Sequence, residues 1–187
     1  MSHLRKTRTW IVNKRPTGAP ILTGEDATFK IVDQDLPRLK VNQVLIRARY
    51  FGNSPAQREW IEPAFEASGS LYRAPILEGQ KMGTRVLGQV VESTSSKFQE
   101  GQWVRAASGW TEYDVLDESD PDLVDAPALP AGMSRTHYLG ALGNTGYSAY
   151  YGYVVVGDAQ PSETVLISAA AGATGVSTRK SASVSSM

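Results

Sequence analysis

The chain has 187 residues, 41% of them hydrophobic, so it is long enough to bury a core and form one domain, or one domain with part of another. Its 19 Lys and Arg residues balance 19 Asp and Glu residues, and this zero formal net charge argues against nucleic acid or a membrane surface as a partner. The sequence has no cysteine, which excludes disulfides, thiolate metal sites and cysteine nucleophiles and fits a reducing compartment.

The N-terminal segment is basic but contains no apolar stretch of the kind found in secretory signals. We interpret it as a lead-in to a first strand at Thr9 to Asn13, in preference to a mitochondrial presequence, and expect a cytoplasmic protein. Its basic residues are Arg5, Lys6, Arg8, Lys14 and Arg15.

The first two thirds of the sequence predict short β-strands separated by turns. Several of these runs alternate apolar and polar residues, which is typical of half-buried antiparallel strands, and their spacing favours a small barrel or sandwich. In residues 43–52, Val44 and Ile46 share one face while Leu45 and Arg47 share the other. The six runs are residues 8–13, 27–33, 43–52, 84–94, 101–107 and 110–116.

Two local features lie within this β-rich region. Gly88 interrupts a predicted strand, where we expect a bulge or a close approach of another backbone segment. After the third strand, Ser54 and Pro55 have the residue types of an N-cap and a first helical position, which predicts a short helix.

The pattern changes to longer periodicities between residues 125 and 160, which indicates a domain boundary. A predicted helix enters through Gly143–Gly146 and stops at Gly157. A compact apolar strand is then predicted from Thr164 to Ser168. The apolar stripe of the helix consists of Tyr147, Tyr150, Tyr151, Val154 and Val155. We interpret the aromatic cluster of Tyr147, Tyr150, Tyr151 and Tyr153 as a packed helix face rather than a substrate site.

The predicted strand runs into a turn of small residues, Ala169 to Gly175, with the spacing of a dinucleotide-binding fingerprint. Small residues let the backbone approach a pyrophosphate and direct helix N-terminal amides at it. Only 12 residues (187 − 175) follow Gly175, and they are rich in serine. The acidic residue that reads the ribose, expected about 20 positions further on, therefore has no counterpart here, and we expect weak or no NADPH binding by this chain.

The sequence predicts no metal site, and it does not indicate which residue is catalytic. His3 and His137 are its only histidines and lack ligand spacing, and we interpret His137 as a helix or surface residue.

The order of several segments resembles the zinc-independent medium-chain dehydrogenase/reductases, and most closely the NADPH-dependent alkenal double-bond reductases, which include the leukotriene B4 dehydrogenase/prostaglandin reductases. These segments are NSPAQREWI, GQVVES, LGNTGYSAYYGYVVVG and ETVLISAAAGATG. The resemblance covers about residues 8 to 176 and stops abruptly at about Val176, as a frameshift, an alternative splice or an altered gene model would produce.

The resemblance implies a mainly β chain, with a GroES-like barrel followed by a helix and the first strand of an incomplete Rossmann α/β domain. The corresponding divisions are residues 1–130 for the GroES-like catalytic domain, 131–176 for the connecting helix and first strand-turn, and 177–187 for a disordered tail outside the family pattern. It implies NADP as cofactor, bound by Pro55, Asn144, Ser148, Ala170, Ala171, Gly172, Ala173 and Gly175. Methionine is usual in the family at the position of Asn144, and threonine at that of Ser148.

The activity that the resemblance implies is hydride transfer from NADPH to the β-carbon of an α,β-unsaturated aldehyde or ketone, in a family that forms homodimers. In such enzymes the cofactor carries the hydride chemistry, and the protein positions it and stabilises the enolate. Two alternatives stay open: a non-catalytic barrel that binds or regulates a partner through residues 134 to 168, and a quinone reductase of the same superfamily.

Overall fold

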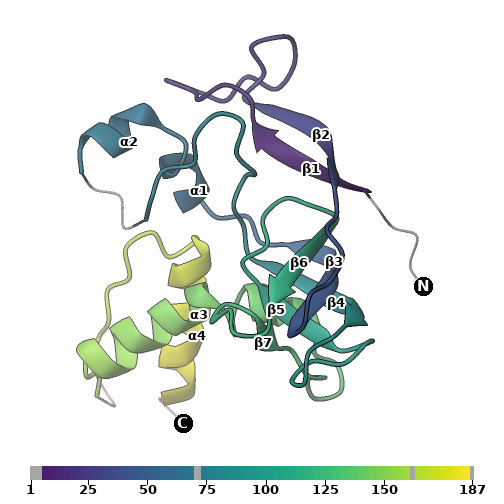
Figure 1. Ribbon diagram of the computed structural model, residues 1–187. Helices are drawn as coiled ribbons and strands as arrows, with labels where there is room; N and C mark the ends of the chain where they lie inside the picture. The colour runs from purple at the N-terminus through teal and green to yellow at the C-terminus, as the bar shows by residue number, and fades with distance from the viewer. Residues whose placement is uncertain (1–5, 70–72, 161–162, 186–187) are drawn as a thin grey trace. The chain divides into compact units, whose positions relative to one another are not determined.

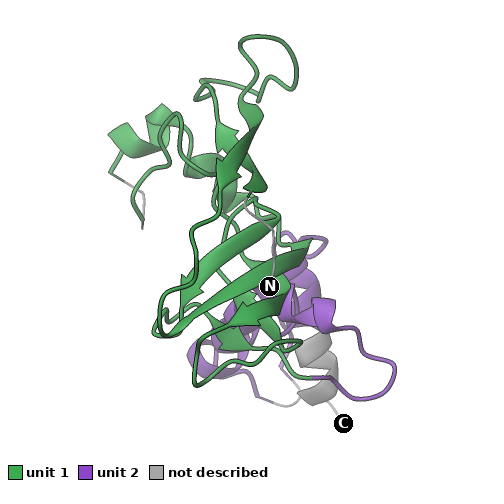
Figure 2. Cartoon of the chain, turned by 45° about the vertical axis from the view of Figure 1, so that its right-hand side comes forward, with its two compact units in different colours: residues 1–127 green, residues 128–187 purple. Residues whose placement is uncertain are grey.

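The computed structural model describes residues 6–69, 73–160 and 163–185, and His3 lies outside them. The chain divides into two compact units, residues 1–127 (unit 1) and residues 128–187 (unit 2), which Figure 2 distinguishes by colour. Within the described residues, no helix is both long and apolar enough to cross a bilayer.

Unit 1 is mainly β, as the sequence predicts, and its strands form two antiparallel sheets (Figure 1). The smaller sheet pairs β1 (Lys6–Val12) with β2 (Phe29–Asp35). The larger sheet has the order β6-β3-β4-β5-β7. Its strands are β3 (Gln43–Phe51), β4 (Val86–Ser93), β5 (Trp103–Ala106), β6 (Tyr113–Asp117) and β7 (Val124–Asp125). All six predicted strands are confirmed, and only the two-residue β7 had no sequence signal.

The described strands do not close into the expected barrel. β1 pairs with β2 along one edge, but on its other edge it makes only the isolated bridges Thr9–Thr111 and Ile11–Lys81. A closed barrel needs a continuous hydrogen-bonded ladder between every pair of neighbouring strands. Unit 1 is therefore an open arrangement of two sheets.

Unit 1 has two hydrophobic clusters. Burying a Val or Ile side chain completely stabilises the fold by roughly 1.5–3 kcal/mol, so these clusters dominate the stability of the unit. The first cluster lies on the larger sheet and contains Val44, Ile46, Val86, Val90, Phe98, Val104, Ala106 and Leu123. The second contains Val12, Ile61, Ile76 and Met82, with Phe29, Trp60 and Trp110 packed against it.

Gly88 lies on β4 where the backbone of β3 approaches closely. A Cβ atom at this position would be 2.7 Å from the carbonyl oxygen of Arg47, and the β3–β4 register shifts nearby, between Ala48 and Tyr50. Both the expected close approach and the expected irregularity are confirmed, and only glycine fits without moving the neighbouring backbone.

Two short helices follow β3. Helix α1 (Ala56–Glu59) has Pro55 at its N-cap, one residue later than predicted, and α2 (Pro63–Ala67) follows Glu62. Ser54 still contributes to the entry of α1, because its backbone N–H donates to Gln57 Oε1 at 2.7 Å, which is half of a capping box.

Unit 2 is helical. It contains a 3₁₀ helix, η1 (Arg135–Leu139), then α3 (Asn144–Tyr150), a π-helical segment η2 (Tyr151–Val156), and α4 (Ala173–Ser185). The predicted helix from about residue 143 to Gly157 is confirmed, and Gly157 is its C-cap. His137 is exposed on η1, in agreement with its interpretation as a surface residue.

Two expectations for unit 2 are corrected. No strand forms at residues 164–168, because none of the described residues of the unit supplies a neighbouring strand, and Leu166 is 97% exposed. The serine-rich tail, expected to be disordered, is helical in α4. The hydroxyls of Ser177 and Thr178 donate to the carbonyls of Ala173 and Thr174 four residues earlier, so these polar side chains are satisfied within the helix.

Candidate functional site

A pocket of about 540 Å³ opens in unit 1 beside the contact between β1 and the segment before β6. Its apolar walls are Trp10, Leu22, Phe29, Ile31, Phe51 and Trp110, and its polar lining is Arg8, Asn53, Thr111 and Glu112. A volume of this size suits a small organic ligand. We call it the aromatic pocket.

A smaller pocket of about 270 Å³ lies next to α1. It shares Phe29, Asn53 and Trp110 with the aromatic pocket. Ser54, Gln57 and Arg58 line it from the segment that carries Pro55. The two pockets are therefore neighbours, and Asn53 lines both.

The backbone holds the walls of the aromatic pocket in place. The N–H of Trp10 donates to the carbonyl of Trp110 at 2.8 Å, and the N–H of Glu112 donates to the carbonyl of Arg8 at 3.1 Å. Between these contacts, the buried hydroxyls of Thr9 and Thr111 are hydrogen-bonded at 2.8 Å. These bonds hold together the backbone segments that carry the two tryptophans.

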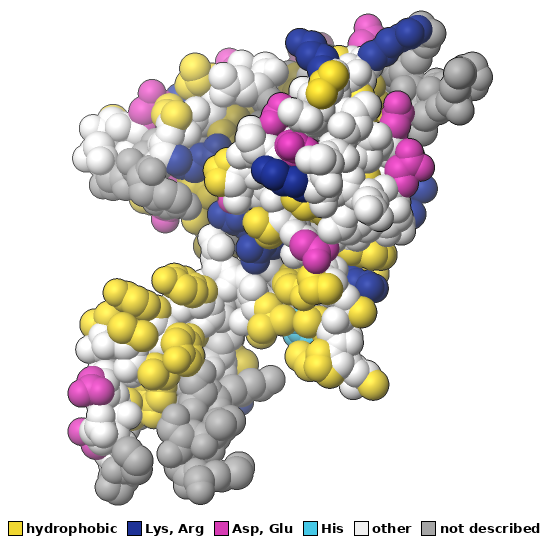
Figure 3. Space-filling view, turned by 60° about the horizontal axis from the view of Figure 1, so that its bottom comes forward, with side chains coloured by type: hydrophobic (Ala, Val, Ile, Leu, Met, Phe, Trp, Pro, Cys, Tyr) yellow, Lys and Arg dark blue, Asp and Glu magenta, His cyan; other side chains and the backbone are white. Residues whose placement is uncertain are grey.

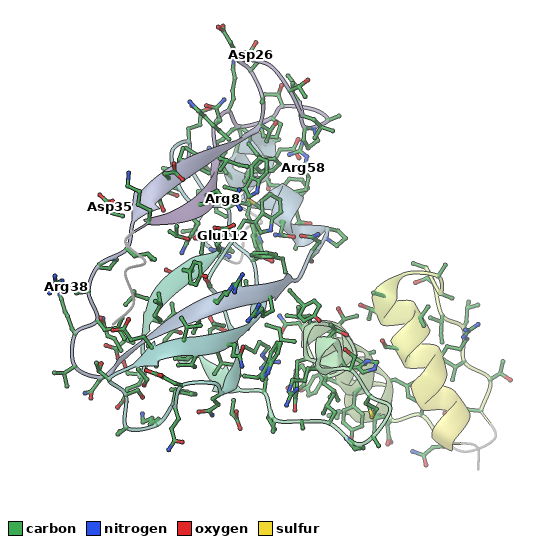
Figure 4. The ribbon with its side chains drawn as sticks, turned by 90° about the vertical axis from the view of Figure 1, so that its right-hand side faces the viewer. Arg8, Asp26, Asp35, Arg38, Arg58 and Glu112 are labelled. Atoms are coloured by element: carbon green, nitrogen blue, oxygen red, sulfur yellow. The ribbon has the colours of Figure 1, made fainter. Side chains whose placement is uncertain are left out.

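The charges at the pocket belong to one ion pair. The side chains of Arg8 and Glu112 face each other where the two sheets meet (Figure 4), and Arg8 Nε donates to Glu112 Oε1 at 3.0 Å. The hydrogen bond from Arg8 lowers the pKa of Glu112, and the same bond raises the pKa of Arg8. Glu112 is therefore ionised at neutral pH, and the pair has no net charge.

Pro55 lies in unit 1, exposed at the start of α1. The side chain of Gln57 fixes this segment, because it accepts a hydrogen bond from the N–H of Ser54 and donates from Nε2 to the carbonyl of Gly83 at 2.8 Å. Gln57 is 6% exposed, so its amide is a buried brace. This brace positions Asn53 and Pro55 together.

Asn144 and Ser148 lie in unit 2 on α3. Asn144 is the first residue of the helix and Ser148 follows one turn later on the same face, with both side chains exposed. The helix entry is tight, since a Cβ atom on Gly143 would lie 2.7 Å from the carbonyl oxygen of Tyr138. The structure thus brings these two candidates together on one face.

The glycine turn opens α4, as its fingerprint spacing predicts. Ala170, Ala171 and Gly172 form the exposed turn, and Ala173 is the first helical residue. The backbone N–H groups of the first turn of a helix have no intrahelical acceptors, so they are available to an anion.

At position 175 of the turn, the neighbouring backbone leaves space only for glycine. A Cβ atom there would lie 2.5 Å from the carbonyl oxygen of Ala169 and 2.7 Å from the Cα of Ala170. In a dinucleotide fingerprint, the third glycine permits this close approach of the helix to the segment before it. The turn therefore has the close helix approach that the third glycine of such a fingerprint permits.

A profile described as the N-terminal domain of oxidoreductase matches residues 8–124. The chain belongs to this family. The resemblance to the zinc-independent medium-chain reductases that the sequence indicated is confirmed, and the aromatic pocket, Pro55 and the smaller pocket all lie within the matched residues.

Two curated relatives extend the likeness into unit 2. The chain is 32% identical over 173 residues to the NADPH-dependent curcumin reductase of Escherichia coli (strain K12), covering 91% of this chain and 46% of that protein. It is 33% identical over 168 residues to prostaglandin reductase 1 of Bos taurus, covering 90% of this chain and 46% of that protein. The chain thus spans about half the length of the curated relatives it matches.

A solved structure supports the fold. CurA from Vibrio vulnificus aligns with a TM-score of 0.80 at 26% identity, over 96% of this chain and 49% of that one. The same protein in complex with NADPH aligns with a TM-score of 0.79 at 27% identity.

Sequence reasoning missed most of the aromatic pocket. Trp10 and Trp110 are 100 positions apart (110 − 10), and Arg8 and Glu112 are 104 apart, so no local pattern links them. The only available signal was the placement of an aromatic residue at a predicted strand on each side. Among the described residues, no cluster of three or more histidine, cysteine, aspartate or glutamate side chains could hold a metal.

Proposed function

We propose that this chain is the N-terminal part of an NADPH-dependent reductase that reduces the C=C bond of α,β-unsaturated aldehydes or ketones. The observation that carries the proposal is the match of residues 8–124 to the oxidoreductase family, together with the close approach at Gly175. The names of the relatives, a curcumin reductase and a prostaglandin reductase, support NADPH and an unsaturated carbonyl substrate.

Residues of both units would contact the cofactor. Amides of the turn from Ala170 to Gly175 would bind the pyrophosphate, and Asn144 and Ser148 would contact the nicotinamide and its ribose. Pro55 would line the nicotinamide end of the cleft, next to Asn53. When bound, NADPH would supply the hydride for the substrate β-carbon, and a proton from water would balance the reduction at the α-carbon.

The experiment follows NADPH consumption by the protein with 4-phenyl-3-buten-2-one, and with 4-phenyl-2-butanone as the saturated control. Since this chain is expected to bind NADPH weakly or not at all, we expect oxidation of NADPH to be slow and to occur only with the unsaturated ketone, with one new hydrogen on each former alkene carbon of the product. Equal rates with the two ketones would contradict the proposal.

The cofactor part has its own test. Gly175→Ala adds a methyl group that meets backbone atoms, and overpacking of this kind costs about 1–3 kcal/mol, so we expect an NADPH dissociation constant raised about tenfold. Gly152→Ala is the matched control, because a Cβ atom there has no neighbour within 4 Å. Calorimetric titration of NADPH measures both, and equal affinities would remove Gly175 from the cofactor site.

We further propose a homodimer in the cytoplasm, which the resemblance implies and the cysteine-free composition allows. Light scattering during gel filtration gives the mass of the assembly, and fractionation of cells gives the compartment.

A second candidate function rests on the exposed apolar face of unit 2. Tyr147, Tyr150, Tyr151, Val154 and Val155 are each at least 36% exposed, and Figure 3 shows hydrophobic side chains gathered over α3 and η2. Such a face suits a non-catalytic partner-binding role. Copurification of a stoichiometric homologue, without enone reduction by the complex, would favour this alternative.

A further inference from the structure

We propose that one face of the larger sheet in unit 1 binds a short acidic segment of another protein that also carries an aromatic side chain. The inference goes beyond the proposed reductase function, because this face lies in unit 1 and shares no residue with either pocket. We call it the arginine face. It consists of Arg47, Arg49, Tyr50, Gln89, Trp103 and Tyr113.

The strand register brings these side chains together. Arg47 of β3 pairs with Tyr113 of β6 on one side and with Gln89 of β4 on the other. Gln89 in turn pairs with Trp103 of β5. Directly opposite residues of antiparallel strands project to the same face, so this row crosses four strands. Their neighbours along β3 and β5 pack in the first hydrophobic cluster, and the row therefore lies on the opposite face of the sheet.

The two exposed arginines of this face form no ion pair with any carboxylate that the structure describes. The guanidinium of Arg47 lies 5.7 Å from the ring centroid of Tyr113, and Arg49 donates to Gln89 Oε1 at 3.3 Å. Arg105 of β5 lies on the same face and adds a third positive charge. A guanidinium has five N–H donors, so Arg47 and Arg49 keep donors for the carboxylates of a partner.

The aromatic side chains of the face suit an apolar or aromatic side chain of the partner. Tyr50 is 47% exposed, and its ring stacks on that of Trp103 with 6.5 Å between centroids. Leu87, which pairs with Tyr50, is fully buried, so the two rings rest on a packed base. A further aromatic ring can stack on this pair while carboxylates beside it contact the arginines.

The acidic residues around the arginine face favour a short partner. Glu112 lies near Arg47, but Arg8 already donates to its carboxylate. Glu92 and Asp117 lie on the same face, toward the first residues of β3. A long polyanion such as a nucleic acid strand would extend from the arginines over these carboxylates and be repelled. A peptide segment with two or three carboxylates can contact the arginines alone.

The test is a titration of a fluorescein-labelled decapeptide, in which glutamate and tyrosine alternate, with the 187-residue chain. We expect the fluorescence anisotropy to give a dissociation constant of about 10–100 μM at low salt. Affinity should fall at least about fivefold between about 20 and 200 mM NaCl, because salt screens exposed charges. A peptide of alternating glutamine and tyrosine should bind about tenfold more weakly, and one of alternating glutamate and serine about threefold more weakly.

Substitutions at exposed positions locate the site. Arg49→Gln removes one positive charge from the face and should weaken binding of the glutamate–tyrosine peptide about threefold to fivefold. Arg38→Gln makes the same change of charge at an exposed position between β2 and β3, and should leave the affinity unchanged. Tyr50→Ala should weaken binding about threefold, whereas Tyr50→Phe keeps the ring and should not.

Equal affinities for the glutamate–tyrosine and glutamine–tyrosine peptides would overturn the inference. So would an effect of Arg38→Gln as large as that of Arg49→Gln. A 12-nucleotide oligouridylate serves as the polyanion control, and tighter binding of this RNA than of the acidic peptide would overturn the assignment of a protein segment as the partner. Unchanged urea midpoints of the Arg49 and Tyr50 variants would show that lost binding reflects the surface rather than unfolding.

Discussion

The two units differ in how completely their own residues bury their apolar side chains. In unit 1, Val44, Ile46, Val86 and Val104 are fully buried. In unit 2, Ala149 is the only described hydrophobic residue that is buried, while Tyr147 is 68% exposed. Unit 1 therefore has the core of an independently stable domain, whereas unit 2 has helices whose apolar face is uncovered.

This difference shows that a sequence pattern predicts an element more directly than it predicts the burial of that element. The alternating pattern of a strand such as β5, in which Val104 and Ala106 are buried, specifies which face is buried, and unit 1 supplies the partners that bury it. The stripe on α3 and η2 specifies a face equally clearly, but the described residues do not cover it. A pattern therefore predicts the element, and the rest of the fold decides whether its apolar face becomes core.

Amide hydrogen exchange gives the largest expected contrast between the units. We expect amides of β3 and β4 to exchange only through global unfolding and amides of α3 and η2 to exchange through local opening. The protection factors should differ by at least about three orders of magnitude, since global stabilities of domains are about 5 kcal/mol or more. Similar protection factors in both units would contradict the expected difference in stability between unit 1 and unit 2.

Truncation of the unit 1 core is the next largest effect. Ile46→Ala removes a fully buried side chain from the first hydrophobic cluster and should cost about 2–5 kcal/mol of unfolding free energy. Val41→Ala, where the side chain is 79% exposed, should change it by less than about 0.5 kcal/mol. All four tryptophans lie in unit 1, so urea denaturation followed by tryptophan fluorescence reports this unit.

Gly88→Ala tests the close contact between β3 and β4. The new methyl group would meet the carbonyl oxygen of Arg47 at 2.7 Å, and the strand must shift at a cost of about 1–3 kcal/mol. Gly18→Ala is the control, because nothing lies within 4 Å of a Cβ atom there. The same urea titration measures both variants. Equal midpoints would show that β3 and β4 accept the methyl group without loss of unfolding free energy.

Acid gives the smallest effect. Hydrogen bonds from Arg8 lower the pKa of Glu112, and hydrogen bonds from Ser95 lower the pKa of Glu118. A carboxyl with a lower pKa in the folded state stabilises that state above its unfolded pKa of about 4.3, and this contribution disappears as the pH falls through the folded value. We expect the urea midpoint of unit 1 to decrease slightly between about pH 5 and pH 3, and less so in Glu112→Gln.

Local sequence patterns were sufficient for the strands, the helix through Gly157 and the role of Gly88, because each depends on neighbours along the chain or on one adjacent strand. They did not predict the open sheets or the helical tail. A strand at residues 164–168 would need a partner strand, and in the tail hydroxyl groups such as that of Thr178 bond to carbonyls within the helix.

The candidate site divides in the same way. The turn at Gly175 is a local motif, so its close backbone contact was predictable from spacing and resemblance. The aromatic pocket requires β1 to lie beside residues 110–112, through hydrogen bonds such as that between the hydroxyls of Thr9 and Thr111, and no sequence period encodes that neighbour.

The uncovered face of α3 and η2 also bears on how the protein behaves at high concentration. Residues 144–156 contain no charged side chain, and the whole chain has zero formal net charge at pH 7. Electrostatic repulsion between molecules is therefore weakest near neutral pH, where the tyrosines and valines of this face remain free to attract one another. We expect the isolated chain to be most soluble in buffers well away from neutrality and in the presence of weakly binding aromatic or nonionic additives.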